Sequence, residues 1–60
     1  MIISYKFLNC IFKQNNLDIE DFDVSNLLNQ ELDTRKYREF DLYCVSKKSE
    51  SENKIIKLTF

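Results

Sequence analysis

The chain contains no glycine and no proline in its 60 residues, and this absence constrains its backbone more than any other feature. At average usage, a chain of this length would carry about four glycines and three prolines. Sites built on a glycine-rich loop, such as the phosphate-binding loop and the dinucleotide fingerprint, are therefore excluded. A turn that needs positive φ must use another residue, and asparagine tolerates that region best. We expect Asn15 and Asn16 to form the first turn.

The sequence also lacks histidine, which is the usual general base and the commonest metal ligand. Two cysteines without a histidine cannot complete a four-ligand zinc site. The acidic segment 18–23 lacks the glycine and the closing glutamate of a calcium-binding loop. We therefore expect no catalytic residues, no metal and no cofactor, and we interpret the chain as a protein that is not an enzyme.

The length allows one small domain, residues 1–60, whose core is marginal for independent stability. Two cysteines, Cys10 and Cys44, are too few for the disulfide framework of a secreted mini-protein. Both lie in apolar segments, so we expect reduced, buried thiols and a cytoplasmic location, the host cytoplasm if the protein is viral. A chain this small often gains stability from a partner subunit.

The net charge is −1, so the chain as a whole attracts neither nucleic acid nor an anionic membrane. The apolar N-terminal run is interrupted by Lys6 and is too short to span a bilayer. The charge is unevenly distributed, however, because residues 1–33 carry a net −4 and residues 34–60 a net +3. This polarity suits a dimer or a partner protein with a mixed surface.

Residues 1–14 are rich in β-branched and aromatic residues, which favours a strand with Ile3, Tyr5 and Phe7 on one face. A helix remains the alternative, because Ile3, Phe7 and Ile11 also fit a 3.6-residue period. The periodicity alone does not decide between the two.

Residues 23–33 are predicted to form a helix. Asp23, or the serine two residues later, can accept hydrogen bonds from the free amides of the first turn. Val24, Leu28 and Leu32 then form one apolar stripe. We expect this stripe to pack on the sheet.

Residues 37–47 and 54–60 alternate between apolar and polar and are predicted to be the two strands of a hairpin. The polar segment between them should form a loop of four or more residues, because no Asn-Gly or Asp-Gly pair is present for a tight turn. The fold class expected is α+β, a small two-layer β-α-β-β domain with a three-stranded sheet and one helix on one face.

Eight aromatic residues are more than so small a core can cover, so some should be exposed and available to a partner. One helix also covers only one face of the sheet. The candidate partner-binding residues are Tyr37, Tyr43, Val45, Ile55, Arg35 and Arg38.

These features favour a protein-binding module that acts by contact. The small size, and the bias towards asparagine, lysine and isoleucine that AT-rich genomes produce, suggest an inhibitor of a host defence protein encoded by a phage or mobile element. The alternatives are a small accessory subunit of a larger assembly and a nucleic-acid-binding regulator, the last disfavoured by acids among the basic residues. We also expect a homodimer at micromolar concentration, formed through the hairpin.

Overall fold

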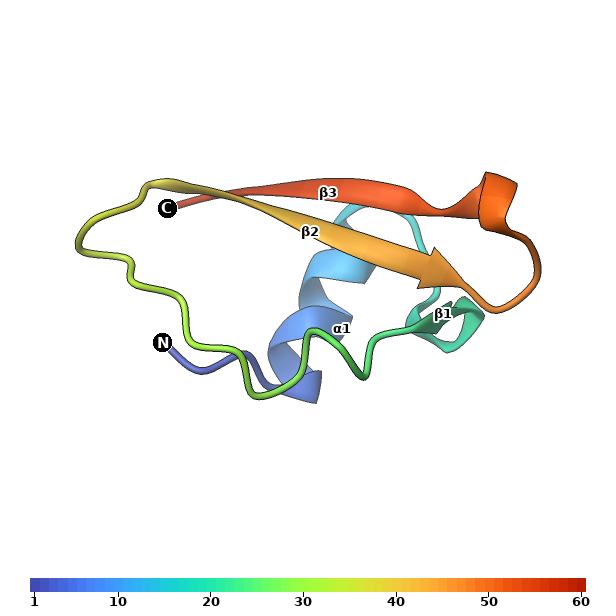
Figure 1. Ribbon diagram of the computed structural model, residues 1–60, viewed down its shortest axis with the longest axis horizontal. Coiled ribbons are helices and arrows are strands. Elements are labelled where there is room, and N and C mark those ends of the chain that lie inside the picture. Colours follow the sequence, from blue (N-terminus) through green and yellow to red (C-terminus); the bar gives the residue numbers. More distant parts are fainter.

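The computed structural model describes all residues, 1–60, as an α+β domain with one helix and a three-stranded antiparallel sheet (Figure 1). The helix α1 spans Tyr5–Gln14, and the strands are β1 (Phe22–Asp23), β2 (Glu39–Ser46) and β3 (Lys54–Thr59), in the order β1-β2-β3. Short 3-10 turns at Ile19–Asp21 (η1) and Glu50–Glu52 (η2) precede β1 and β3. The expected fold class is confirmed, but the helix comes first in the chain, so the expected order of elements is wrong.

The N-terminal segment forms a helix, so the strand predicted there is wrong. Ser4 caps the helix by accepting a hydrogen bond from the Phe7 amide at 3.2 Å. At the other end, Asn16 has φ of 57°, and the Leu17 amide donates to the Phe12 carbonyl at 2.8 Å. These features form a Schellman C-cap with asparagine in the position that glycine usually fills. The two caps satisfy backbone groups at both ends, and the helical period buries one apolar face.

Residues ahead of α1 retain part of the predicted extended character. Ile2 forms an antiparallel bridge with Glu31. The Ile3 amide donates to the Gln30 carbonyl at 2.8 Å, and the Asn29 amide donates to the Ile3 carbonyl at 2.9 Å. These bonds hold the start of the chain against residues 29–32.

Residues 23–33 do not form the predicted helix. Asp23 belongs to β1, and its carboxylate accepts hydrogen bonds from both the amide and the hydroxyl of Ser25. The segment that follows is a series of turns. The Asn29 amide, which a helix would direct to residue 25, instead bonds to Ile3, and Asn29 has φ of 65°. A long-range backbone bond has therefore replaced the local helical one.

The turns nevertheless bury most of the apolar residues that the helix was expected to bury. Val24 and Leu32 belong to the core, as predicted. Leu27 is buried as well, whereas Leu28, the centre of the expected stripe, is only partly buried. The sequence therefore predicted most of the residues that this segment buries, but not the backbone conformation that buries them.

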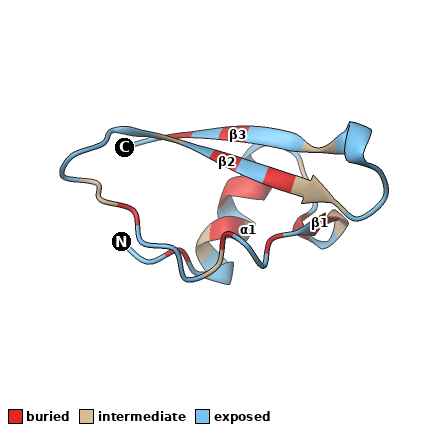
Figure 2. Cartoon of the chain, viewed as in Figure 1, coloured by how far each residue is buried: buried red, intermediate tan, exposed pale blue.

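The hairpin of β2 and β3 is the longest regular element and matches the two predicted strands closely. Its register places Leu42 opposite Ile56 and Tyr43 opposite Ile55. Leu42, Cys44, Ile56 and Leu58 are buried, and α1 lies beneath the two strands that carry them (Figure 2). Seven residues, 47–53, connect the strands and include η2, in agreement with the predicted longer loop.

One apolar core lies between α1 and the inner face of the sheet (Figure 2). Within it, Phe12 of α1 packs against Phe22 of β1, with ring centroids 5.4 Å apart in an edge-to-face arrangement. Thirteen side chains form this core: Ile3, Leu8, Ile11, Phe12, Ile19, Phe22, Val24, Leu27, Leu32, Leu42, Cys44, Ile56 and Leu58.

Both cysteines are free thiols in the structure. Cys44 is buried on the inner face of β2, as expected. Cys10 is exposed, so its predicted burial is wrong. The reason is the change from strand to helix, because α1 turns Cys10 away from the face that carries Leu8 and Phe12.

Candidate functional site

The outer face of the hairpin carries an apolar patch that no element of the chain covers. Tyr43 and Ile55 are direct cross-strand partners, and Val45 lies two residues further along β2 on the same face. The side chain of Ile55 is 69% exposed, that of Tyr43 is 50% exposed and Val45 is partly buried. We call Tyr43, Val45 and Ile55 the outer patch. The structure thus brings together three of the six candidate residues.

A hydrogen bond restrains the side chain of Tyr43. Its hydroxyl accepts a hydrogen bond from the Asn53 side-chain amide at 2.7 Å. The carbonyl oxygen of the same asparagine side chain accepts from the Ser46 amide at 2.8 Å. A partner that docks on Tyr43 therefore meets a ring whose conformational freedom has already been reduced, which lowers the entropic cost of binding.

Charges of both signs border the outer patch on one side. Asp41 lies opposite Lys57, and the Lys57 ammonium is 3.8 Å from the Glu39 carboxylate. These groups are exposed, so the ion pair contributes little to stability. An apolar centre with a charged rim is the arrangement found in protein–protein interfaces.

The other three candidates lie elsewhere. Arg35 and Tyr37 belong to the connection before β2, and Arg38 immediately precedes that strand. Arg38 is five residues from Tyr43, which corresponds to about 17 Å along an extended chain. The six predicted residues therefore do not form one surface.

Tyr37 belongs to a separate aromatic cluster at the end of the hairpin away from η2. Its ring contacts Phe40 with centroids 6.0 Å apart, and Phe40 contacts Phe60 at 5.7 Å, both edge to face. Tyr37 is 59% exposed and Phe60 43% exposed. Phe60 follows the last residue of β3 and remains partly uncovered. The exposure of Tyr37 and Tyr43 agrees with their choice as candidate residues, and Tyr5 and Phe60 are exposed as well.

The sheet also has backbone groups without partners. The Phe60 amide donates to the Arg38 carbonyl at 2.8 Å, so residues 38 and 60 are a hydrogen-bonded pair. Because such pairs alternate along an antiparallel ladder, Ile55, Lys57 and Thr59 direct their N–H and C=O groups away from β2. No hydrogen bond of the chain reaches these groups. The sequence could not show this, because it depends on the register.

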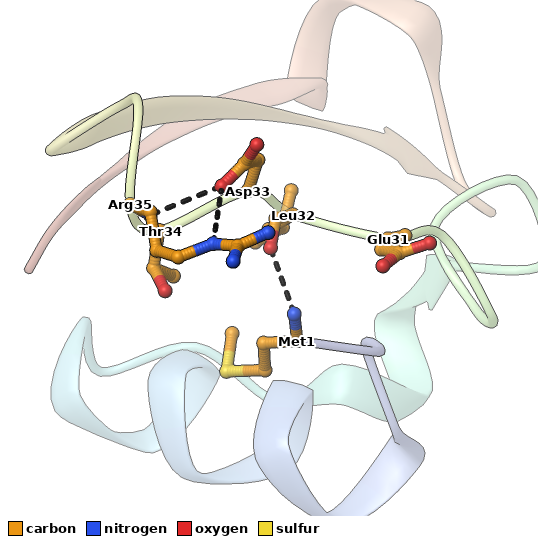
Figure 3. A pocket seen from close by; sticks show the side chains of 6 residues that line it. All are labelled: Met1, Glu31, Leu32, Asp33, Thr34 and Arg35. Atoms are coloured by element: carbon orange, nitrogen blue, oxygen red, sulfur yellow. Dashed lines mark hydrogen bonds and ion pairs between the residues drawn. The ribbon is translucent and has the colours of Figure 1, made fainter.

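A shallow hollow of about 580 Å³ lies beside the N-terminus (Figure 3), and none of its lining residues belongs to the outer patch. The Met1 ammonium donates to the Leu32 carbonyl at 2.8 Å, and Asp33 accepts from the Arg35 amide at 3.1 Å. Met1, Leu32, Asp33 and Arg35 thus bond to one another within the hollow (Figure 3). They form no pair of nucleophile and base.

Burial and hydrogen bonding shift three pKa values. The hydrogen bond from Tyr5 to Glu20, 3.0 Å long, raises the pKa of the phenol. The hydroxyl and amide of Ser25 lower the pKa of Asp23. Burial raises the pKa of the Cys44 thiol and so reduces its reactivity. None of the three groups belongs to the outer patch.

No family model matches the chain, and the searches of curated proteins and of solved structures give no match either. The cysteines, aspartates and glutamates do not gather in groups of three that could hold a metal ion. The single α-helix falls short of the length and apolar character that crossing a bilayer requires. The function must therefore be argued from the surface.

Proposed function

We propose that this protein is a non-catalytic binding module that docks on another protein through the outer patch of Tyr43, Val45 and Ile55. The observation that supports it is the exposure of Ile55, 69%, beside a half-exposed tyrosine on an uncovered sheet face. Single exposed apolar residues are ordinary on protein surfaces, but contiguous ones with a charged rim are typical of interaction sites.

The chemistry of the outer patch suits an interface hot spot. Tyrosine gives a large contact area and carries one polar group, and the hydrogen bond from Asn53 to the Tyr43 hydroxyl already restrains that side chain. Burying the 69% of Ile55 that is exposed against a partner would contribute about 1–2 kcal/mol. The exposed charges of Glu39 and Lys57 would then determine which partners are accepted.

In this proposal the protein is encoded by a phage or mobile element and acts in the cytoplasm. It inhibits a host defence protein by covering part of that protein's surface. The support for this part of the proposal is the small size and the amino-acid composition of the chain. An accessory subunit of a larger assembly would use the same patch. We also propose that the chain forms a homodimer, which would offset the small core.

Affinity capture on the immobilised chain, from a lysate of the host cell, tests the proposal. The comparison is between the wild type, Tyr43→Lys, and Lys6→Glu as a matched control on the exposed part of α1. We expect a protein retained by the wild type and the control but lost with Tyr43→Lys. Equal retention by all three baits would contradict docking through the outer patch. Retention of DNA or RNA that falls steeply with salt would favour the regulator instead.

A further inference from the structure

The edge of β3 is open along its whole length. Its residues Ile55, Lys57 and Thr59 present unpaired N–H and C=O groups on the side away from β2. In Figure 1, β3 forms the upper border of the molecule, and α1 and β1 lie below it. An edge of this kind is a template for another strand.

The opposite edge of the sheet is closed to self-pairing. β1 already pairs with Val45 and Ser46, so only residues 39–44 of β2 are free. Glu39 and Asp41 lie in that stretch and direct their backbone groups to this edge. Antiparallel registers that avoid β1 place carboxylates opposite each other, which is unfavourable.

We propose that two copies of the chain pair through β3, antiparallel, with Ile55 of each copy on the two-fold axis. This inference rests on the proposed homodimer and specifies its interface. The result is a continuous sheet in the order β1-β2-β3-β3-β2-β1. On its outer face, Tyr43 and Ile55 of one copy continue into Ile55 and Tyr43 of the other, so the most exposed isoleucine of the chain meets its own copy.

Side-chain pairing selects this register. The outward-facing groups of β3 can form hydrogen bonds only when odd-numbered residues lie opposite odd-numbered residues, because a shift of one residue would turn the side chains to opposite faces. With Ile55 on the axis, the two β3 strands overlap at residues 54–56, and the two hydrogen bonds of the Ile55–Ile55 pair join them, while Lys57 lies opposite Asn53. Centring the axis on Lys57 would place two ammonium groups directly opposite each other. Centring it on Ile56 would leave each Ile55 facing a lysine. With Ile55 on the axis, the two Lys57 α-carbons are about 14 Å apart.

In this arrangement the two Lys54 side chains are diagonal neighbours on the inner face of the sheet. Lys54 is exposed, so its amine can extend into solvent. The remaining repulsion and the short strand place the dimer among weak, micromolar associations. Added salt should therefore strengthen the dimer, since it screens the lysines.

Disulfide trapping tests the register. The exposed thiol is first removed with Cys10→Ser, and Ile55→Cys or Lys57→Cys is then added as a matched pair on the same exposed face of β3. Opposed α-carbons in a hydrogen-bonded pair lie about 5.5 Å apart, within the range for a disulfide. In oxidised glutathione at about 100 μM chain, we expect Ile55→Cys to form a linked dimer and Lys57→Cys to stay monomeric.

Trapping of Lys57→Cys alone would overturn the proposal, because it places the axis two residues further along. Failure of both variants to link, whether the chain is dimeric or shows a constant mass near 7.3 kDa in sedimentation, would overturn it as well. Tyr43→Lys keeps the β3 edge and should still be trapped in an Ile55→Cys background. If Ile55→Cys is not trapped as a dimer but the wild type still captures a protein that Tyr43→Lys does not, the dimer is refuted. The proposed docking function is unaffected by that result.

Discussion

Substitutions of two adjacent leucines, Leu27 and Leu28, distinguish the observed turns of residues 25–29 from a helix over the same residues. In a helix, Leu28 would be the centre of the apolar stripe. In the structure Leu27 is only 4% exposed, and Leu28 is partly buried at the margin of the core. The two variants Leu27→Ala and Leu28→Ala remove the same atoms from neighbouring positions, so each is the control for the other.

The expected costs differ because burial differs. Truncating a buried leucine costs about 2–5 kcal/mol. Leu27 lies in a turn that can partly collapse, which places its cost near the lower end, about 2–3 kcal/mol. Leu28 has less area to lose, so we expect about 1 kcal/mol. A domain of this length has a free energy of unfolding of about 3–9 kcal/mol, so Leu27→Ala alone removes a large share of it.

Urea unfolding followed by far-ultraviolet circular dichroism measures both variants. A small domain has an m-value of about 1 kcal/mol per molar urea. Leu27→Ala should lower the midpoint by about 2–3 M, or abolish the cooperative transition, and Leu28→Ala should lower it by about 1 M. If Leu28→Ala costs as much as Leu27→Ala or more, residues 25–29 are not in the observed turns.

Three further outcomes follow from the thiols, from Tyr5 and from Asn29. One thiol, Cys10, should react with a labelling reagent at once, and the second, Cys44, only after denaturation; two fast groups would contradict the burial of Cys44. The raised pKa of Tyr5 means that its bond to Glu20 contributes stability below pH 10.0, the ordinary value, and loses it as pH rises through the folded pKa. Tyr5→Phe should flatten this alkaline loss in thermal melts, and an unchanged pH profile would show that the bond does not form. Asn29→Gly should be neutral or slightly stabilising and Asn29→Ala should cost about 1 kcal/mol, because the residue has positive φ; equal effects would contradict that geometry.

The hairpin was predictable because its signal is local and repeated. Alternating residues in β2 and β3 determine which side chains face the core, and the polar segment between them marks the loop. The exposure of Tyr43 and Ile55 follows directly, since one helix covers one face. The candidate site was therefore predicted to the extent that it depends on the period of a strand.

The N-terminal helix was only the alternative to a strand, because β-branched and aromatic content outweighed the capping signals. Ser4 at the N-cap, with Ile3 and Leu8 at the positions of a hydrophobic staple, was the pattern that indicated a helix. Both of these apolar residues are fully buried. The helix predicted for residues 23–33 was wrong for the opposite reason. The local apolar pattern fits a helix, but the Asn29 amide bonds to the distant Ile3 carbonyl instead of to a helical partner.

Alternate amides of β3 should differ in hydrogen–deuterium exchange. At a concentration where the chain is monomeric, the amides of Ile55, Lys57 and Thr59 face water and should exchange within the dead time of the experiment. Those of Ile56, Leu58 and Phe60 donate across to β2 and exchange only when the hairpin opens. If opening costs about 3 kcal/mol, neighbouring amides on one strand differ about a hundredfold in rate. One strand thus records both the accessibility of its edge and the stability of the hairpin.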